Sequence, residues 1–257
     1  MRLFLCTAIL LVSSLAQAET VTAKSWLVAD QQGTIVKGEN IDAIRPVASI
    51  SKLITAMIVL DANQDLNERL VFKTFTSKKR PHEKKPKVTT QDLTRRQLLD
   101  LALVHSDNHA AMVLCNNYPS GTEGCIHAMQ VKTATLGMMN TSMFDPTGLD
   151  PRNVSTAKDL ILLVRAARKY PVILEAGKQS RVEIQIKKKW LIFNNTNPMI
   201  GKDRRIVVSK TGFINASGGC IVLGLDTDLG ERTVVVLGSK NTHTRIPEAE
   251  FISKIKE

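Results

Sequence analysis

The stretch SISKLITAMIVLDA, residues 49–62, is the segment from which the fold of this chain is best worked out. Its apolar residues, among them Leu53, Met57 and Leu60, recur three or four positions apart, which is the spacing of a helix. Most positions are apolar, so the pattern predicts a buried helix and not one that lies on the surface.

Ser49 and Lys52 open this segment, and a spacing of three places them on one face of a helix, one turn apart. At a first helical turn, backbone N–H groups favour a negative charge that develops nearby. A neutral lysine can take the proton of a serine hydroxyl, provided that burial or a second cation lowers its pKa from about 10.4. The pair therefore indicates a nucleophilic serine, although S-x-x-K tetrapeptides are also common on helix surfaces.

Outside this segment, the chain predicts helices in its middle and strands at both ends. Thr94 with Gln97, and Thr156 with Asp159, form capping patterns that mark helix starts. The pattern predicts an α/β (α+β) fold in which one antiparallel sheet packs against a helical region. The expected helices cover 98–104, 108–116, 122–136 and 160–169, with a C-terminal helix opened by Pro247, and the expected strands cover 25–29, 34–37, 182–186, 206–209, 220–225 and 233–237.

Two more short motifs carry possible chemistry. Ser106-Asp107-Asn108 lies at a break between two expected helices, where all three residue types also suit an ordinary N-cap. Lys210-Thr211-Gly212 follows an expected strand, and its glycine would let a ligand approach closely, although a glycine at a strand end is commonplace. Singly, each motif has an ordinary structural explanation. Together, in this order and in these settings, they indicate an acyl-transfer site.

The three motifs S-x-x-K, S-x-N and K-T-G resemble those of the penicillin-recognising serine acyl-transferases. The resemblance narrows to the D-alanyl-D-alanine carboxypeptidase family, and within it to the small periplasmic D-alanyl-D-alanine endopeptidases, and runs from about Lys24 to Leu237. It implies a penicillin-recognising serine transpeptidase-like fold that acts on peptidoglycan peptides and is acylated by β-lactams. The residues that carry it are 45–53 (RPVASISKL), 145–149 (DPTGL), 153–160 (NVSTAKDL), 195–197 (NTN) and 210–213 (KTGF).

The resemblance implies catalytic roles for three side chains. Ser49 would be the acylated nucleophile and Lys52 its proton acceptor. Ser106 would relay a proton toward the leaving amine, with Lys210 contributing to the proton path and to the local positive field. It implies neither a metal nor another cofactor.

The resemblance also implies how substrate would be held. Asn108 would hydrogen-bond the substrate's amide, and Lys210 and Thr211 would hold its carboxylate, with Gly212 allowing close approach to the strand. The backbone N–H groups of Ser49 and Phe213 would form the oxyanion hole, in which each donor contributes about 3–4 kcal/mol.

The start of the chain predicts export. A basic Met1-Arg2, an apolar stretch at 3–15 and the small residues Ala16 and Ala18 form a secretory signal peptide, residues 1–18. We therefore expect a periplasmic protein with a single peptidase domain, residues 19–257, and no transmembrane anchor. The residues after Gly212 suffice for two strands and a closing helix, so we expect neither a C-terminal β domain nor a membrane-anchor helix.

The charge of the chain points to anionic surroundings. Thirty-five basic residues against 24 acidic residues give a net charge of +11. The run Lys78–Lys87 (KKRPHEKKPK) reads either as a solvated loop between short strands or as a segment that attracts anionic wall or membrane components, an effect that would fade with salt. Few aromatic residues and no recognition motif argue against nucleic acid as a partner.

Three cysteines follow the predicted leader, so at least one stays free or pairs outside the chain. Cys115 and Cys125 could bridge two neighbouring helices, but the sequence leaves this open. Cys220 lies in an apolar strand pattern and reads as a small buried hydrophobe.

Three other functions fit the sequence less well. A class A β-lactamase needs a glutamate between the second and third motifs, and residues 124–174 contain none. A zinc peptidase could use His105 and His109, but the glutamate of H-E-x-x-H is missing and a helix break separates the pair. A non-catalytic cell-wall-binding protein would not need all of Ser49, Lys52 and Lys210, which are present.

Overall fold

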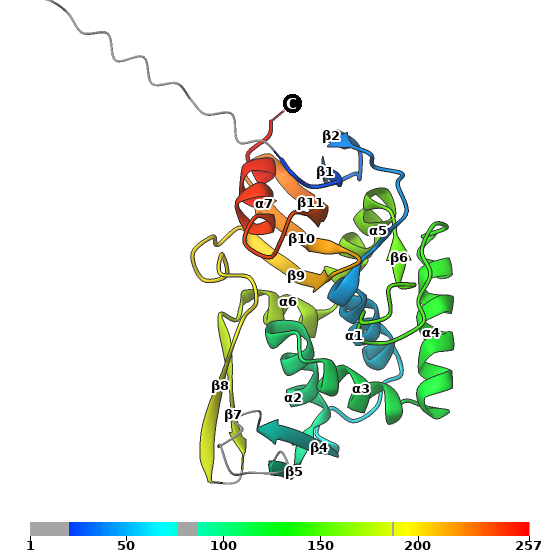
Figure 1. Ribbon diagram of the computed structural model, residues 1–257, viewed down its shortest axis with the longest axis vertical. Coiled ribbons are helices and arrows are strands. Elements are labelled where there is room, and N and C mark those ends of the chain that lie inside the picture. Colours follow the sequence, from blue (N-terminus) through cyan, green and yellow to red (C-terminus); the bar gives the residue numbers. More distant parts are fainter. Residues whose placement is uncertain (1–20, 77–86, 187, 257) are drawn as a thin grey trace, which may run out of the picture.

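An antiparallel sheet of five strands forms one side of the molecule (Figure 1). The computed structural model describes residues 21–76, 87–186 and 188–256. The strand order is β2-β1-β11-β10-β9, so β9 lies at an edge of this sheet. The bounds are β1 Ser25–Ala29, β2 Ile35–Glu39, β9 Ile206–Ile214, β10 Gly218–Thr227 and β11 Gly230–Ser239.

Helices cover both faces of the sheet. On one face, α7 (Arg245–Ser253) packs Ala249 and Ile252 against apolar side chains of β1, β10 and β11. On the other face lie α1 (Ser51–Asp61), α5 (Ala157–Ala167) and α6 (Pro171–Lys178) (Figure 1). Because both faces are covered, nearly every residue of β10 and β11 is buried, which explains their continuous apolar runs.

The other side of the molecule is helical and is built around α1. There, α2 (Arg95–Asp100) continues into a π-helical turn, η2 (Leu101–His105), and is followed by α3 (Asn108–Asn116) and α4 (Gly121–Thr135). All residues of α1 from Ser51 to Val59 are buried, as the apolar pattern of the opening stretch predicts. This helix joins the sheet side to the helical side, and its first turn lies where the two meet.

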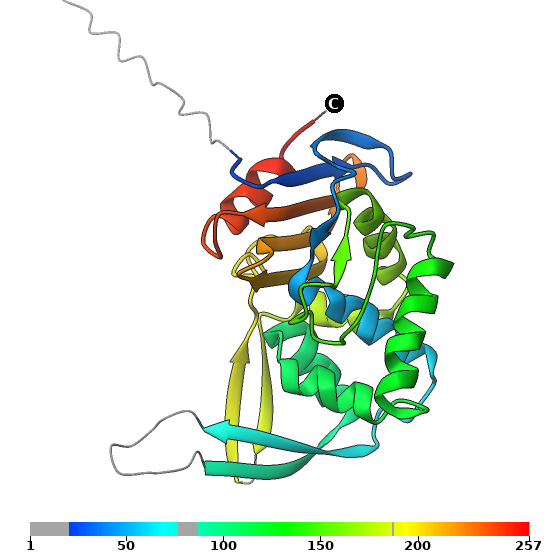
Figure 2. The same ribbon diagram turned by 45° about the vertical axis from the view of Figure 1, so that its right-hand side comes forward.

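Two β-hairpins extend from the helical side (Figure 2). One pairs β4 (Arg69–Thr76) with β5 (Lys87–Thr94), and the other pairs β7 (Arg181–Ile186) with β8 (Lys189–Asn194). A short ladder of β3 (Arg45–Pro46) and β6 (Val154–Ser155) joins the segment before Ser49 to the segment before α5. The predicted signal peptide, and the basic run Lys78–Lys87 apart from the backbone of Lys87, lie outside the described residues.

The structure confirms the predicted α+β arrangement and corrects it in five places. The C-terminal helix begins at Arg245, with Pro247 in its first turn, where a proline is tolerated. Pro171 opens a helix of its own, α6, and β8 has no counterpart among the predicted strands. The helix predicted at 98–104 is an α-helix that changes to a π-helical turn. Ser49 lies in a 3-10 turn, η1 (Ala48–Ile50), just before α1.

No helix within the described ranges combines the length and apolar character needed to cross a bilayer.

A disulfide answers the question that the cysteine spacing leaves open. Cys115 near the end of α3 is bonded to Cys125 in α4, with their Cα atoms 5.4 Å apart. Cys220 is a buried free cysteine on β10, as predicted. The disulfide therefore fixes the α3–α4 connection at the far end of the helix that begins at Asn108.

Replacing both Cys115 and Cys125 by Ala should lower the free energy of unfolding by about 2–3 kcal/mol, because a closed loop of this length restricts the unfolded chain by about that much. Urea denaturation measures the change. The double variant should no longer respond to reductant, whereas the parent chain should lose the same stability when reduced. Equal stability of the two oxidised proteins would contradict the prediction.

Candidate active site

The predicted Ser49–Lys52 pair is present as a direct contact. Lys52 Nζ lies 2.9 Å from Ser49 Oγ, across the step from η1 to α1. Ser49 is half-buried, while the Lys52 side chain is fully buried in the first turn of α1. The two groups are thus held together at the start of α1.

Lys52 Nζ has two further partners, the Oδ1 atom of Asn108 and the backbone carbonyl of Thr147, both at 2.6 Å. Burial lowers the pKa of Lys52 to about 7, although the negative charges of Asp145 and Asp107 oppose this change. A neutral amine has two N–H donors and one lone pair. Two donors suit the Asn108 and Thr147 oxygens, which leaves the lone pair directed at the Ser49 hydroxyl. This arrangement allows Lys52 to accept the proton of Ser49.

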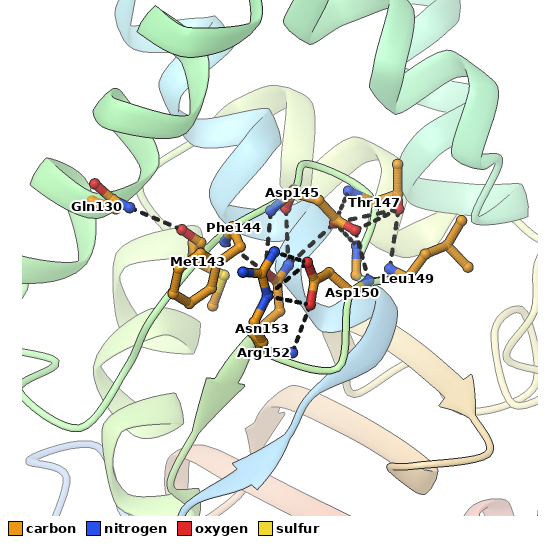
Figure 3. A network of polar contacts seen from close by, with 10 residues as sticks. Gln130, Met143, Phe144, Asp145, Thr147, Leu149, Asp150, Arg152 and Asn153 are labelled. Carbon is orange, nitrogen blue, oxygen red and sulfur yellow. Dashed lines mark hydrogen bonds and ion pairs between the residues drawn. The ribbon is translucent and has the colours of Figure 1, made fainter.

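The Thr147 carbonyl is held in place by a loop built around the carboxylate of Asp145 (Figure 3). One oxygen, Oδ1, accepts hydrogen bonds from the backbone N–H groups of Thr147 (2.7 Å) and Gly148 (2.5 Å). The other, Oδ2, accepts from the Asp150 N–H at 2.7 Å. A carboxylate that gathers several backbone donors fixes the path of the loop, and so fixes the acceptor that Thr147 offers to Lys52.

Asn153 joins this loop to the segment that carries Ser49. Its side chain accepts from Phe144 N–H and donates to the Ser51 Oγ and to the Asp145 carbonyl. Its backbone carbonyl accepts from Val47 N–H at 3.0 Å. Asn153 is fully buried, so these bonds are shielded from water and hold the loop against the turn before α1.

Two glycines let the chain approach Ser49 from opposite sides. Gly148 has φ +79°, and a Cβ atom there would lie 1.9 Å from the Ala48 carbonyl oxygen. A Cβ on Gly212 of β9 would lie 3.0 Å from Ser49 N and from the Cβ of Ala48. Ala48 itself has φ +47°, a strained conformation for a non-glycine residue. The Ser49 backbone is therefore clamped between the loop and β9.

The second predicted motif faces the third. Lys210 Nζ donates to Ser106 Oγ at 2.8 Å and to the Thr211 carbonyl at 2.9 Å. Ser106 has φ +61° and ends the π-helical turn, and Asp107 then caps α3 by accepting from Ala110 N–H. The N-cap reading of this motif is thus correct for Asp107, while Ser106 and Asn108 point their side chains at the two lysines.

Lys210 is 1% exposed, and its burial together with the charges of Lys52 and Arg245 holds its pKa well below the usual value. Three basic side chains thus gather around one small region of β9. Two buried lysines beside each other favour release of a proton from one of them, and they favour binding of an anion.

Two residues of the site were missed by the sequence analysis as individual contributors. Arg245, at the start of α7, donates to the Gly212 carbonyl at 2.6 Å. Thr196, which follows β8, shares a hydrogen bond of 2.6 Å with the Thr211 hydroxyl. Arg245 is far from every motif in sequence, and only the packing of α7 against β10 and β11 brings it near. Thr196 was part of a stretch that carried the family resemblance, but no role was attached to it.

The remaining residues singled out from the sequence, Phe213, His105 and His109, lie on three different elements. Phe213 continues β9 beyond Gly212, and its side chain is exposed. His105 ends η2, where its Nδ1 atom lies 3.0 Å from the Asn194 carbonyl and its ring meets Phe193 edge-on. His109 lies on α3 and stacks against Phe72. The two histidines therefore belong to different elements and different contacts.

An α+β fold with these three facing motifs defines the class of the penicillin-recognising serine peptidases. The chain belongs to the D-alanyl-D-alanine carboxypeptidase family (peptidase S11), whose family model matches residues 12–241.

Curated relatives support this assignment over most of the chain. The D-alanyl-D-alanine endopeptidase of Escherichia coli (strain K12) is 34% identical over 237 residues, which cover 91% of this chain and 76% of the relative. The D-alanyl-D-alanine endopeptidase of Pseudomonas aeruginosa is 38% identical over 236 residues, covering 90% and 76%.

Solved structures confirm the fold. Penicillin-binding protein D2 from Listeria monocytogenes, in its ampicillin-bound form, superposes with a TM-score of 0.77 at 26% identity and covers 91% of this chain and 97% of its own. A mutant of the Streptomyces K15 DD-transpeptidase gives a TM-score of 0.79 at 22% identity, with the same coverage.

Replacing Gly148 by Ala should cost about 3 kcal/mol or more of stability and slow acylation of Ser49, because a methyl group has no room beside the Ala48 carbonyl. Gly137→Ala is the matched control. Gly137 also has a positive φ (+75°), but the nearest atom to its Cβ would be 3.9 Å away, so only the backbone strain of about 1–2 kcal/mol applies.

Thermal or urea denaturation of both variants measures the stability difference, and the rate of covalent labelling by benzylpenicillin measures the effect on Ser49. Equal losses in Gly148→Ala and Gly137→Ala would show that the close approach at Ala48 is unimportant.

Proposed function

We propose that the chain is a serine-type D-alanyl-D-alanine peptidase that cleaves peptidoglycan stem peptides or cross-links through an acyl-enzyme on Ser49. The observation that carries the proposal is the contact of Ser49 with a buried lysine whose pKa lies at about 7, in a chain that belongs to a D-alanyl-D-alanine carboxypeptidase family. Cleavage of cross-links is preferred over trimming of terminal D-alanine, because the relatives described above are named endopeptidases.

In the first step, Lys52 Nζ takes the proton of the Ser49 hydroxyl while Ser49 Oγ bonds to the carbonyl carbon of a D-alanyl residue. The carbonyl oxygen becomes negatively charged and is stabilised by the N–H groups of Ser49 and Phe213. The close contact between Gly212 and Ser49 N supports this assignment, since it brings β9 alongside the nucleophile.

In the second step, the bond from the carbonyl carbon to the leaving nitrogen breaks, and the amine takes a proton from the Ser106 hydroxyl. Lys210, which is hydrogen-bonded to Ser106, replaces that proton. Water then attacks the ester carbonyl and gives a proton to Lys210, which restores the proton that Lys210 lost in the preceding step. The bond from the carbonyl carbon to Ser49 Oγ breaks, and Ser49 recovers its proton from Lys52. Ser106 therefore acts as the relay between Lys210 and the leaving amine.

The binding of substrate follows from the edge position of β9. No other strand among the described residues pairs with the outer edge of β9, so an extended peptide can align there. Asn108 would hydrogen-bond the amide of the substrate, while Lys210 and Arg245 would supply positive charge for its carboxylate and Thr211 a hydroxyl donor. Gly212 keeps the strand bare of a side chain at the point of closest approach to Ser49.

A β-lactamase is not favoured. Within residues 124–174 there is no glutamate to activate a deacylating water. The Asp145 carboxylate is occupied by the N–H groups of its own loop. A penicillin adduct on Ser49 should therefore be released slowly.

We further propose that residues 1–18 direct export, that the single peptidase domain spans 19–257, and that the enzyme works in the periplasm. The membership of the family and the names of the relatives support a cell-wall setting. Electrostatic association through Lys78–Lys87 remains a prediction.

The decisive experiment compares the chain from residue 19 onward with its Ser49→Ala variant. Incubation with benzylpenicillin should give one stable covalent adduct, seen by intact mass, on the parent and none on the variant. Turnover of purified cross-linked muropeptides should fall by at least about 10⁴-fold in Ser49→Ala. Release of terminal D-alanine alone would contradict the endopeptidase preference, and rapid penicillin hydrolysis without an adduct would favour a β-lactamase.

The pH dependence of acylation tests Lys52. Asp107 raises the pKa of Lys52, so Asp107→Asn should lower that pKa below about 7. Since Lys52 must be neutral to accept a proton, the acid limb of the acylation rate should move to lower pH. Asparagine caps a helix as well as aspartate, so α3 should be unaffected.

Asp150→Asn is the matched control, because Asp150 lies in the same region but pairs with Arg152 and does not influence the pKa of Lys52. Its pH profile for benzylpenicillin acylation should match that of the parent. A shift of the Asp107→Asn profile to higher pH would remove Lys52 from the role of proton acceptor.

A further inference from the structure

The β7–β8 hairpin has two different faces. In its antiparallel register, Val182 lies opposite Phe193 and Ile184 lies opposite Leu191, and these pairs share the inner face. Val182, Ile184 and Phe193 pack there against the helical side, while Leu191 is 39% exposed. The opposite face carries the pairs Gln185–Trp190 and Glu183–Ile192. The second face points away from the core.

This outer face exposes apolar surface that the fold does not use. Trp190 is 65% exposed and Ile192 is 57% exposed, and they lie two positions apart on β8, so they form one continuous stripe. Large exposed side chains in a contiguous patch mark an interaction site more often than scattered ones do. The hairpin projects from the end of the molecule opposite α7 (Figures 1 and 2).

The same hairpin is cationic. Lys188 is exposed at its turn, and Lys189, which pairs with Ile186, is exposed at the first position of β8 on the face opposite to Trp190. The one acid on the outer face, Glu183, is neutralised by an ion pair with Arg181 at 2.9 Å. The hairpin therefore combines an exposed aromatic and an exposed aliphatic side chain on its outer face with positive charge at its tip.

The β4–β5 hairpin lies beside β7, where Gln91 Nε2 donates to the Gln185 carbonyl. This contact covers the β7 side of the ribbon. Within the described residues, β8 pairs with β7 alone, so the strand that carries Trp190 and Ile192 forms the outer edge.

Tryptophan and lysine side by side are the residues that lie at the boundary between headgroups and acyl chains of a bilayer. An anionic wall polymer or a nucleic acid would match the lysines and could stack on Trp190, but it would offer no apolar phase in which to bury the aliphatic Ile192. A second copy of the chain would bring the lysines of two hairpins together, which like-charge repulsion opposes.

We propose that the outer face of the β7–β8 hairpin docks on the surface of a bilayer that contains anionic phospholipid. Trp190 and Ile192 enter the interface, and Lys188 and Lys189 contact the lipid phosphates. Docking is reversible and weakens with salt, because part of the attraction is electrostatic.

The test is flotation of the chain from residue 19 onward with vesicles of phosphatidylcholine, alone or with about 30 mol% phosphatidylglycerol. The parent should float with the anionic vesicles at low salt and separate from them at high salt. Trp190 fluorescence should shift to the blue on binding, against a constant background from the buried Trp26. Trp190→Phe should remove the shift and keep the binding.

Trp190→Ser/Ile192→Ser should weaken binding by about tenfold or more, as should Lys188→Glu/Lys189→Glu. Leu229→Ser is the matched apolar control, since Leu229 is similarly exposed but lies at the β10–β11 turn. Lys202→Glu/Lys240→Glu is the matched charge control, at exposed positions outside the hairpin. Both controls should bind within about twofold of the parent. An unchanged rate of benzylpenicillin acylation shows that each variant is folded.

Three results would overturn the proposal. The Trp190→Ser/Ile192→Ser variant could bind vesicles like the parent, with binding lost only when Lys78, Lys79, Lys84 and Lys85 are replaced. The hairpin variants could instead lose binding to purified peptidoglycan while the parent ignores vesicles, which would identify a wall polymer as partner. The parent could form a dimer that the hairpin variants abolish, which would identify a second copy as the occupant.

Discussion

Burial of the Lys52 amine beside Ser49 is the constraint on which the rest of the structure depends. A charged ammonium ion in such a place is disfavoured by loss of hydration, so burial favours the neutral form. The same burial would be costly if the amine lacked acceptors, and the Asn108 and Thr147 oxygens supply them. Asp107 and Asp145 keep the pKa at about 7, where the lysine can both accept and release a proton. The pKa of Lys52 is thus set by a balance between desolvation, which lowers it, and two nearby negative charges, which raise it.

Four separate segments meet around the Lys52 amine, because it must be both buried and supplied with acceptors. The helix α1 delivers Lys52, the first residue of α3 is Asn108, the loop around Asp145 delivers the Thr147 carbonyl, and β9 closes the remaining side. The loop and β9 both bring backbone to very short range. Glycine at positions 148 and 212 removes the side chains that would stand in the way, and Asn153 holds the loop to the turn before α1. The loop is therefore part of the site even though its side chains do not touch Ser49.

Lys210, like Lys52, is a buried lysine that contacts a serine hydroxyl and has a lowered pKa, but its proposed role in the reaction is different. It is as deeply buried as Lys52, and this burial, together with the charges of Lys52 and Arg245, holds the pKa of Lys210 well below its usual value. Ser106 lies against Lys210 as Ser49 lies against Lys52. Two serine–lysine pairs, one on each side of a narrow site, allow a proton to leave on one side and arrive on the other, which acyl transfer to and from an amine requires.

The sequence predicts those parts of the fold and site that depend on local pattern. The buried helix at 49–62, the helix at 108–116, the strands at 206–209, 220–225 and 233–237, and the capping box at Thr94 are confirmed, because periodicity and capping are local signals. The contacts Ser49–Lys52 and Ser106–Lys210 also follow from the motifs. Their assigned roles as catalytic groups remain predictions.

What the sequence does not predict depends on contacts between distant segments. Arg245 reaches Gly212 only because α7 packs on the sheet, and nothing in its neighbourhood marks it. The helix α6 is not among the predicted helices, because a proline such as Pro171 can either follow the end of one helix or stand at the first position of the next. The strand β8 was missed because KWLIFN has no alternation: one of its faces packs and the other exposes Trp190 and Ile192. A strand that is apolar on both sides usually lies inside a sheet. In a hairpin that no further strand covers, the outward-facing apolar side chains do not contribute to the core. Contact of Trp190 and Ile192 with a bilayer accounts for this exposed surface beside the lysines.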